Sequence, residues 1–452
     1  MPHYMHARKG GACFKLTIVR RTTQIKDIDN SMRYNYNHLK VKMKALLVLA
    51  FLNVGFASTY PRHLPSDQLK ALGLDNLAAK ISKAANQTME DMVRSKGYDI
   101  ESHYVTTTDG YILNIFRIPN GKNGESNGKI VFLQHGLLVS SIDWVTTEKS
   151  LAYMLADEGY DVWLGNSRGN TFGRNHTTLD PEVDKAAFWS FSWHEIGNID
   201  VPTMIDYILE ETGSEQIHYV GHSQGTTSFY VMASTKPDYN DKIISSVSLA
   251  PIGFMENMTS PILRILANWQ GPLGGLMELL GLYELLPGDD FISTIATGIC
   301  SDEGAGAILC ENFIFLLCGF NNNQMNLTLL PTIMAQVPAG CATRQLVHYG
   351  QEIQSGRFCQ YDYGYLENLN KYGALTPPDY NLALITSPVH MIYSVNDWMA
   401  GLKDVDRLCE GLGNCVDKYE VEDKTFNHID FIYGMGAPTL VYKEVVKILA
   451  KY

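Results

Sequence analysis

The sequence has no C-x-x-C pair, internal repeat or low-complexity segment. After residue 57, no apolar run approaches the roughly 18 residues that a membrane-spanning helix needs. Basic residues are also few, because 36 Lys and Arg stand against 48 Asp and Glu, a net charge of −12. A chain this acidic does not favour nucleic acid. We therefore expect no transmembrane segment after residue 57, no bound metal, no cofactor and no nucleic-acid partner.

What is present is the composition of a globular protein. The 452 residues are 45% hydrophobic and 19% charged, as in ordinary soluble domains. This length allows two to three average domains, or one large α/β domain that carries an insertion.

A basic and then apolar segment lies near the start of the chain. Three lysines precede a largely apolar stretch at residues 45–56, and small residues follow it, which is typical of a secretory signal peptide cleaved after Ala57. A buried helix or a membrane anchor is the alternative, although twelve apolar residues are few for a membrane span. We expect either a start at Met43 or an unstructured leader over 1–42. Removal of residues 1–57 leaves 26 basic and 46 acidic residues, a net charge of −20.

Cysteines and sequons agree with passage through an oxidising compartment. Seven cysteines follow the cleavage point, and their close spacing favours three local disulfides and one spare thiol over a metal site. Four N-x-S/T sequons are candidate glycosylation sites. The predicted pairs are Cys300–Cys310, Cys341–Cys359 and Cys409–Cys415, and the sequons are at Asn86, Asn175, Asn257 and Asn326.

Apolar strands and amphipathic helices alternate along much of the chain. After a hairpin that turns at Asp109-Gly110, continuous apolar strands follow one another with helices between them, which indicates a mostly parallel sheet covered on both faces. The expected strands are at residues 129–136, 160–166, 216–223, 243–251, 387–394 and 418–423, and the expected helices are at 149–159, 201–213, 226–237 and 404–412.

The alternation stops after Pro251 and resumes after Pro378. The residues between are leucine-rich and helical in pattern, which predicts a helical insertion within the α/β domain. Only part of residues 288–318 is expected to face lipid, since most apolar residues of such an insertion form its own core. The predicted organisation is a leader and signal peptide over 1–57, an α/β core over 58–251 and 378–452, and the helical cap and lid over 252–377.

The pattern G-x-S-x-G, typical of a serine nucleophile at a sharp strand-to-helix turn, occurs three times. Ser126 lies in a glycine- and asparagine-rich loop without a preceding strand. Ser167 follows a strand but leads into a loop, so Arg168 beside it is expected to form a structural ion pair. Ser223 follows a strand, and its motif GHSQG leads into eleven residues without Gly or Pro, 226–236, ended by Pro237. We therefore predict Ser223 as the nucleophile.

A nucleophilic serine needs a base and an orienting acid, in the chain order Ser, Asp or Glu, His. His428 lies in a loop after the last strand, and Asp397 lies just past the preceding strand. The predicted triad is Ser223, Asp397 and His428. The competing residues are His348 in the insertion, His390 inside a strand, and Asp404, Asp406 and Asp430, which we expect to be structural, solvated or capping groups.

Two backbone N–H groups are candidates for stabilising a developing oxyanion. One belongs to Gln224, directly after the nucleophile, and the other to Leu137, in the loop after the first central strand. His135 in the same loop is expected to be structural.

Several motifs together resemble the acid lipase family, which includes gastric and lysosomal acid lipases and insect digestive lipases. The resemblance covers about residues 88–450 and rests on LQHGLL, WLGNSRGN, HYVGHSQGTT, LLCGFN, GRFCQYDYG and NHIDF, in this order. It implies an α/β-hydrolase fold with a helical cap and lid, the triad and oxyanion donors named above, a Cys300–Cys310 disulfide and a free Cys318. The sequence departs from the mammalian pattern in its four remaining cysteines and in SDEGAGAI, which lengthens the lid region.

These observations predict a secreted or lysosomal lipase that hydrolyses acylglycerols or sterol esters at a lipid–water interface, as a monomer. Two alternatives use the same fold. One is a catalytically silent lipid-binding or storage protein, because a fold does not guarantee activity. The other is an acyltransferase, in which an alcohol replaces water as the acceptor.

Overall fold

The structure of the protein is a computed structural model that describes residues 77–268, 281–285, 318, 319, 321 and 323–452. The chain divides into two units, Met1–Thr59 and Tyr60–Tyr452, and all described residues belong to the second. The predicted signal peptide, with its apolar stretch at 45–56, and the predicted Cys300–Cys310 disulfide lie outside the described residues.

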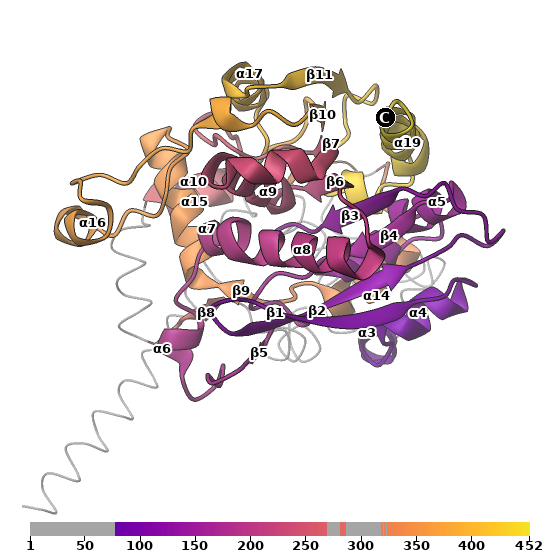
Figure 1. Cartoon of the computed structure of the whole chain (residues 1–452). Coiled ribbons are helices and arrows are strands. Elements are labelled where there is room, and N and C mark those ends of the chain that lie inside the picture. Colours follow the sequence, from indigo (N-terminus) through magenta and orange to yellow (C-terminus); the bar gives the residue numbers. More distant parts are fainter. Residues whose placement is uncertain (1–76, 269–280, 286–317, 320, 322) are drawn as a thin grey trace, which may run out of the picture. The chain divides into compact units, whose positions relative to one another are not determined.

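A nine-stranded sheet, mostly parallel, forms the centre of the described part (Figure 1). Its strand order is β1-β2-β4-β3-β6-β7-β10-β11, and β5 pairs with β2. The pairs β1–β2, β2–β4 and β2–β5 are antiparallel, whereas every pair from β4 to β11 is parallel. The strands are β1 (Glu101–Thr106), β2 (Tyr111–Ile118), β3 (Ile130–Gln134), β4 (Asp161–Leu164), β5 (Asn175–His176), β6 (Ile217–His222), β7 (Ile243–Leu249), β10 (Val389–Tyr393) and β11 (Cys415–Glu420).

The central strands are apolar throughout because both faces of the sheet are covered. In β3, Phe132 packs into one hydrophobic cluster and Val131 and Leu133 pack into another, as expected where successive side chains point to opposite faces. The first cluster contains Met204 of α8 (Val201–Thr212) and residues of α9 (Gln224–Thr235), and the second contains residues of α5 (Leu151–Asp157) and α19 (Lys443–Leu449). The predicted alternation of strands and helices is thus confirmed.

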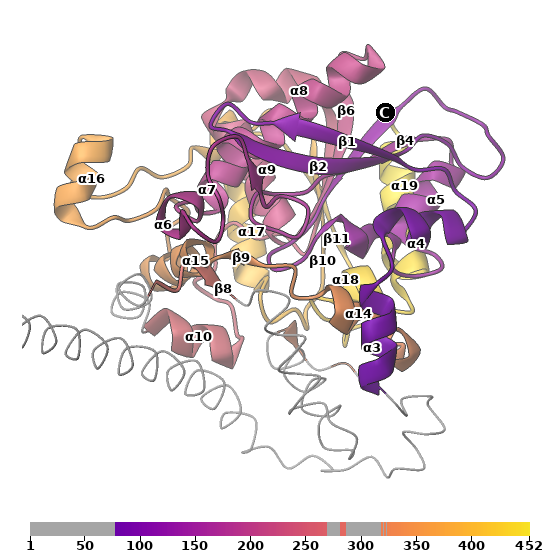
Figure 2. The same ribbon diagram turned by 90° about the horizontal axis from the view of Figure 1, so that it is seen from below.

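The remaining helices lie around this core (Figures 1 and 2). Among the described residues, none of the helices is both long and apolar enough to cross a bilayer. Further helices are α3 (Leu77–Ala85), α4 (Met89–Ser95), α6 (Lys185–Phe188), α7 (Trp193–Glu195), α17 (Leu402–Gly411) and α18 (Asp430–Tyr433).

Between β7 and β10, the described residues form helices and one short strand pair. The strands β8 (Glu284–Leu285) and β9 (Cys341–Ala342) pair antiparallel. In α15, the Tyr349 hydroxyl lies 3.1 Å from Thr227 Oγ1 on α9, so the first turn of α9 contacts this segment. The helices are α10 (Pro261–Asn268), α14 (Leu330–Gln336), α15 (Thr343–Ser355) and α16 (Tyr365–Tyr372).

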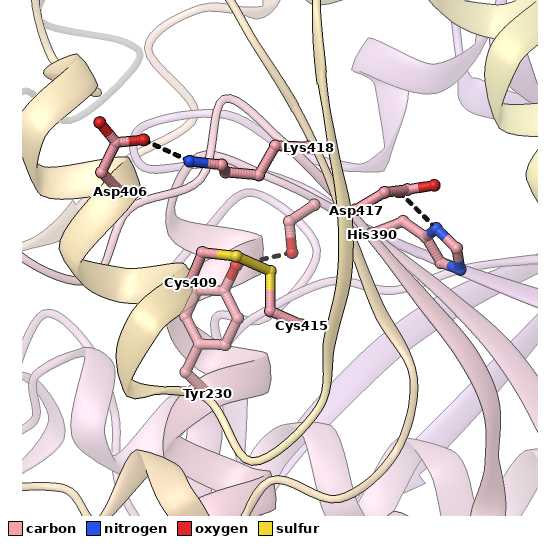
Figure 3. The surroundings of a disulfide bond; sticks show 8 residues. Tyr230, His390, Asp406, Cys409, Cys415, Asp417 and Lys418 are labelled. Carbon is pink, nitrogen blue, oxygen red and sulfur yellow. Dashed lines mark hydrogen bonds and ion pairs between the residues drawn. A yellow bond between two sulfur atoms is a disulfide. The ribbon is translucent and has the colours of Figure 1, made fainter.

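One predicted disulfide is present and one is wrong. Cys409 and Cys415 are bonded, with Cα atoms 5.4 Å apart, and join the end of α17 to the start of β11 (Figure 3). Cys341 and Cys359 are both free and buried, as is Cys318, which was expected to be free. Each cysteine has contacts of its own: Cys341 pairs with Leu285 of β8, whereas the Cys359 carbonyl lies 3.0 Å from His348 Nε2 in the middle of α15. Closeness in the sequence therefore does not bring the two thiols together.

The last strand lies three residues earlier than predicted. β11 covers Cys415–Glu420 rather than 418–423, since its pairing with β10 ends where Tyr393 lies opposite Glu420. In β10, His390 contacts Asp417 of β11 at 2.6 Å and the Tyr452 hydroxyl at 2.9 Å (Figure 3). His390 is therefore the satisfied structural histidine that its place inside a strand predicts.

The four sequons differ in how their asparagines are placed. Asn86 and Asn175 are exposed, and Asn326 is half-buried. Asn257 donates its side-chain amide to Asp404 Oδ1 at 2.8 Å, so a glycan there would have to displace this contact. Glycosylation stays a prediction at all four.

Candidate active site

The turn after β6 holds Ser223 in a backbone conformation that side chains rarely adopt. Its φ is 53° and its ψ is −120°, and the residue stands directly before the first residue of α9. Its N–H donates to the Leu249 carbonyl at the end of β7 (3.0 Å). Strain of this kind at a strand-to-helix turn is typical of a nucleophile whose hydroxyl must stand clear of the sheet.

The two glycines of GHSQG allow this turn because the space beside them is filled by backbone. A Cβ on Gly221 would lie 2.7 Å from the carbonyl carbon of Gly225, and one on Gly225 would lie 2.2 Å from the carbonyl oxygen of Gln134. The first turn of α9 and strand β3, to which these atoms belong, cannot move aside without breaking their backbone hydrogen bonds. Any larger residue at either position would therefore distort this strand-to-helix turn, residues 221–225, which we call the elbow.

The structure brings the three predicted triad residues into one hydrogen-bonded chain. His428 Nε2 lies 2.8 Å from Ser223 Oγ, and His428 Nδ1 lies 2.8 Å from Asp397 Oδ2. All three side chains are buried. The other oxygen of Asp397 accepts from the N–H groups of Met399 and Ala400, which fixes the carboxylate toward the imidazole. A hydroxyl, an imidazole and a carboxylate in this order can carry out nucleophilic catalysis.

Cys318 and Gly319 join the loop of Asp397 to the loop of His428. The Cys318 carbonyl accepts from His428 N–H at 3.3 Å and lies 3.5 Å from the Trp398 nitrogen. Asn427 donates its side-chain amide to the Gly319 carbonyl at 2.7 Å. Because neighbours of both Asp397 and His428 contact the same segment, it fixes the distance between the two loops.

Asp430 closes the turn that carries His428. Its Oδ2 accepts from the Asn427 N–H at 2.7 Å and from the Asn321 amide at 2.8 Å. Burial raises the pKa of Asp430 to about 7. Of the two expected roles, solvated or capping, the structure supports capping, since Asp430 is buried and accepts from the Asn427 N–H just before α18.

His222, the residue before the nucleophile, holds the backbone of the base. Its Nε2 lies 3.0 Å from the His428 carbonyl, to which it donates, and the two imidazole rings are 5.1 Å apart. Burial, with the neighbouring His428, lowers the pKa of His222 to about 3, so its ring stays neutral in moderately acidic solution. His428 is thus held at its N–H by Cys318 and at its carbonyl by His222.

The loop after β3 approaches the nucleophile closely. A Cβ on Gly136 would lie 3.2 Å from the Ser223 Cβ, so the next residue, Leu137, lies beside the elbow, and Gln224 opens α9 on the other side. Both remain predicted oxyanion donors. His135 links this loop to the next turn: its Nδ1 lies 2.7 Å from the Gly136 carbonyl, and its Nε2 accepts from Ser167 N–H at 3.1 Å.

The other two G-x-S-x-G serines lie outside this arrangement. The Ser126 hydroxyl accepts from Gly128 N–H in an exposed loop. Ser167 is buried, and its hydroxyl accepts from the Gln134 amide at 2.9 Å. Arg168 beside it forms the expected ion pair, with Asp200 and also with Asp109, both at 2.6 Å.

The competing candidates have structural partners. His348 contacts Ser192 Oγ and the Cys359 carbonyl and stacks on Trp193, with ring centroids 3.7 Å apart. Asp406 forms a surface ion pair with Lys418 (Figure 3). Asp404 is buried and accepts from the N–H and the amide of Asn257, so it is not the solvated group that we expected.

Sequence reasoning missed the residues that brace the triad, namely His222, Asp430, Asn321 and the carbonyl of Cys318. Their contacts join positions up to 206 residues apart, and no spacing rule in one sequence indicates them.

Comparison with known proteins places the chain in a family. The family model described as "Partial alpha/beta-hydrolase lipase region" matches residues 89–148, and the one described as "alpha/beta hydrolase fold" matches residues 129–278. Lipase 3 of Drosophila melanogaster is 44% identical over 366 residues, which cover 80% of this chain and 92% of that protein.

Mammalian relatives match over a similar length. Gastric triacylglycerol lipase of Rattus norvegicus is 38% identical and covers 81% of this chain and 92% of its own length. Lysosomal acid lipase/cholesteryl ester hydrolase of Macaca fascicularis is 35% identical and covers 82% of this chain and 93% of its own length. The chain therefore belongs to the acid lipase family and has the α/β-hydrolase fold.

Proposed function

We propose that the protein is a lipase that hydrolyses carboxylic esters of neutral lipids, with Ser223, His428 and Asp397 as its catalytic triad. The observation that carries this proposal is the hydrogen-bonded chain Ser223–His428–Asp397 at a strained strand-to-helix turn. A serine held only for structure would need neither a positive φ nor a buried imidazole on its hydroxyl.

The proposed reaction follows from the roles of these groups. His428 takes the proton of Ser223 as the hydroxyl attacks the ester carbonyl, and Asp397 stabilises the imidazolium. The N–H groups of Gln224 and Leu137 stabilise the oxyanion, helped by the positive end of α9. The alcohol leaves with a proton from His428, and water then hydrolyses the acyl-enzyme with His428 as base.

The proposed substrates are acylglycerols and sterol esters. Support comes from the relatives, which are named for triacylglycerol and cholesteryl ester hydrolysis, and from the acidic composition, which favours neutral over anionic lipid. The proposed location is outside the cell or in the lysosome. The Cys409–Cys415 disulfide supports it, since such bonds persist in oxidising compartments. We propose a monomer that acts at the lipid–water interface.

The test is a substrate panel with the purified protein. We expect hydrolysis of a medium-chain p-nitrophenyl ester, and of emulsified triacylglycerol or cholesteryl ester in preference to phospholipid, measured from pH 4 to 8. A lipid-binding protein without activity would bind these lipids and release no fatty acid. An acyltransferase would transfer the acyl group to an added alcohol faster than to water. Either result would overturn the proposal.

A further inference from the structure

An apolar surface lies on α16, which projects from the described part in both views (Figures 1 and 2). Its members are Tyr365, Leu366 and Leu369 on the helix and Leu375 just after it, with exposed fractions of 73%, 81%, 48% and 55%. On a helix, residues three and four apart are neighbours, so the first three side chains form one stripe. Contiguous exposed apolar residues of this kind mark interaction surfaces.

Polar contacts next to the apolar side chains tie the helix to the residues before and after it. Asn368 is buried, donates to Asp362 Oδ1 at 2.7 Å and to the Leu375 carbonyl at 3.0 Å, and accepts from Tyr363 N–H. The Tyr372 hydroxyl, one turn later, donates to the Tyr361 carbonyl. The leucines are therefore presented outward by a braced segment, so contact with a partner orders little additional chain.

The same segment is hydrogen-bonded to α15, which in turn contacts α9, the helix that follows Ser223. Gln351 of α15 exchanges two hydrogen bonds of 2.9 Å with the backbone of Asp362. Two residues earlier in α15, the hydroxyl of Tyr349 contacts Thr227 in the first turn of α9.

The apolar surface of α16 lies toward the carboxyl ends of the parallel strands, which is also the end of the sheet where Ser223 lies. A helix between two parallel strands runs opposite to them, so the first turn of α8, which leads to β6, lies at the carboxyl ends of the strands. Ser223 follows β6 at that same end. Figure 1 shows α7, α10, α15 and α16 all at the starting end of α8.

The charges of this segment favour an uncharged partner. Residues 360–376 hold Asp362, Glu367 and Lys371 as their only charged residues. Lys371 lies over the Tyr363 ring at 4.6 Å, and Glu367 accepts from Asn370, so these charges lie off the apolar stripe. With no cluster of basic residues, the segment offers nothing to an anionic headgroup.

We propose that the apolar surface of α16 adsorbs to the surface of neutral lipid droplets and holds the nucleophile's side of the protein against its substrate. This inference rests on the proposed function for the identity of the substrate. A second copy of the chain is the other occupant that such a surface could take, and the test separates the two.

The experiment compares Leu366→Ser and Leu366→Ser/Leu369→Ser with the unmodified protein. Tyr104→Ser, which removes an exposed apolar side chain (63% exposed) from edge strand β1, is the matched control. Adsorption to triolein droplets is measured by flotation, with every variant also made in a Ser223→Ala background so that no chemistry intervenes. Turnover of a soluble p-nitrophenyl ester is measured in parallel.

We expect droplet affinity to fall about tenfold for Leu366→Ser and further for the double variant, because an inserted leucine contributes roughly that much. Soluble-ester turnover should not change, and Tyr104→Ser should adsorb normally. The proposal is overturned if the double variant adsorbs like the unmodified protein, if Tyr104→Ser loses as much, or if the leucine changes dissolve a dimer and leave adsorption intact. Absence of ester hydrolysis would overturn the proposed function alone, since adsorption is read independently.

Discussion

Two turns of this protein carry the same G-x-S-x-G letters after neighbouring parts of the same sheet, yet they are built for different purposes. In GHSQG, a Cβ on either glycine would meet backbone atoms, and the serine takes a positive φ. In GNSRG, a Cβ on Gly165 or Gly169 would instead approach side chains, those of Gln134 and Phe132 or of Phe191 and Trp189.

The two serines also differ in their hydrogen-bond partners. Ser223 faces an imidazole that is itself held by a carboxylate. Ser167 accepts from an amide, and its neighbour Arg168 is enclosed by Asp200, Asp109 and the ring of Tyr111. One turn concentrates reactive groups, whereas the other neutralises charge inside the fold. The pattern alone therefore indicates a tight turn, and the partners decide what that turn does.

The largest expected effect comes from removing each serine hydroxyl in turn, which tests whether the two turns have different roles. Ser223→Ala should lower kcat by about 10⁴-fold or more, because the nucleophile is lost. Ser167→Ala should leave kcat within about threefold and reduce the free energy of unfolding by about 1–3 kcal/mol, since the Gln134 amide loses its acceptor. Ester hydrolysis and urea unfolding of both variants check this. Activity that survives in Ser223→Ala but disappears in Ser167→Ala would reverse the assignment.

The ion cluster of the GNSRG turn predicts the largest effect on stability. Arg168→Met leaves Asp200, which is fully buried, without its cation, and such a loss costs about 3–5 kcal/mol. Arg357→Met is the matched control, because Arg357 is 35% exposed and pairs with Asp379, which is 60% exposed; it should cost about 1 kcal/mol or less. Urea midpoints measure both. Equal losses would mean that the Arg168 cluster is no more important than a surface pair.

Much of this contrast could be predicted from the sequence, for definite reasons. The strands of the core are continuous apolar runs, and the eleven residues after GHSQG, 226–236, contain no helix breaker, so the elbow was distinguishable from the GNSRG loop. Chain order then selected Asp397 and His428, which the structure brings within hydrogen-bonding distance of one another and of Ser223. Their catalytic roles stay a prediction until activity is measured.

The errors arose where distance in space is independent of distance in sequence. The pairing of Cys341 with Cys359 assumed that near neighbours in the chain meet, but Cys341 lies in the β8–β9 pair and Cys359 lies beside His348 of α15. Asp404 and Asp430 were expected to be solvated or capping carboxylates, but both are buried and accept hydrogen bonds from distant segments, those of Asn257 and Asn321. Only the folded chain shows such partners.

Asp430 gives the loop that carries His428 a pH dependence. Burial raises the pKa of Asp430 to about 7, so between roughly pH 4 and 7 the folded state holds a proton that the unfolded chain has released. The free energy of unfolding should then fall as pH rises through this window, by at most about 2 kcal/mol between pH 5 and 7.

Asp430→Asn, which keeps a neutral side chain of the same shape, should flatten this fall in thermal melts across the pH series. Asp423→Asn is the control, since hydrogen bonds from Thr425 lower the pKa of Asp423 and place its stability window below about pH 4. A melting curve for Asp430→Asn with the same pH dependence as the unmodified protein would contradict the assignment.

The smallest expected effect tests whether the elbow positions the base as well as the nucleophile. His222→Leu removes the donor to the His428 carbonyl, and one such hydrogen bond corresponds to about a tenfold fall in kcat. KM should change little, because His222 touches the base and not the substrate-facing side of the turn. His222→Gln, which retains an N–H donor, should recover part of the loss.

His218→Leu is the matched control, since His218 is buried in the same strand but contacts Ser245; it should keep kcat whatever it costs in stability. An equal fall in kcat for both leucine variants would show that His222 only supports the strand, and would leave the base loop to be held by Cys318 and Asp430 alone.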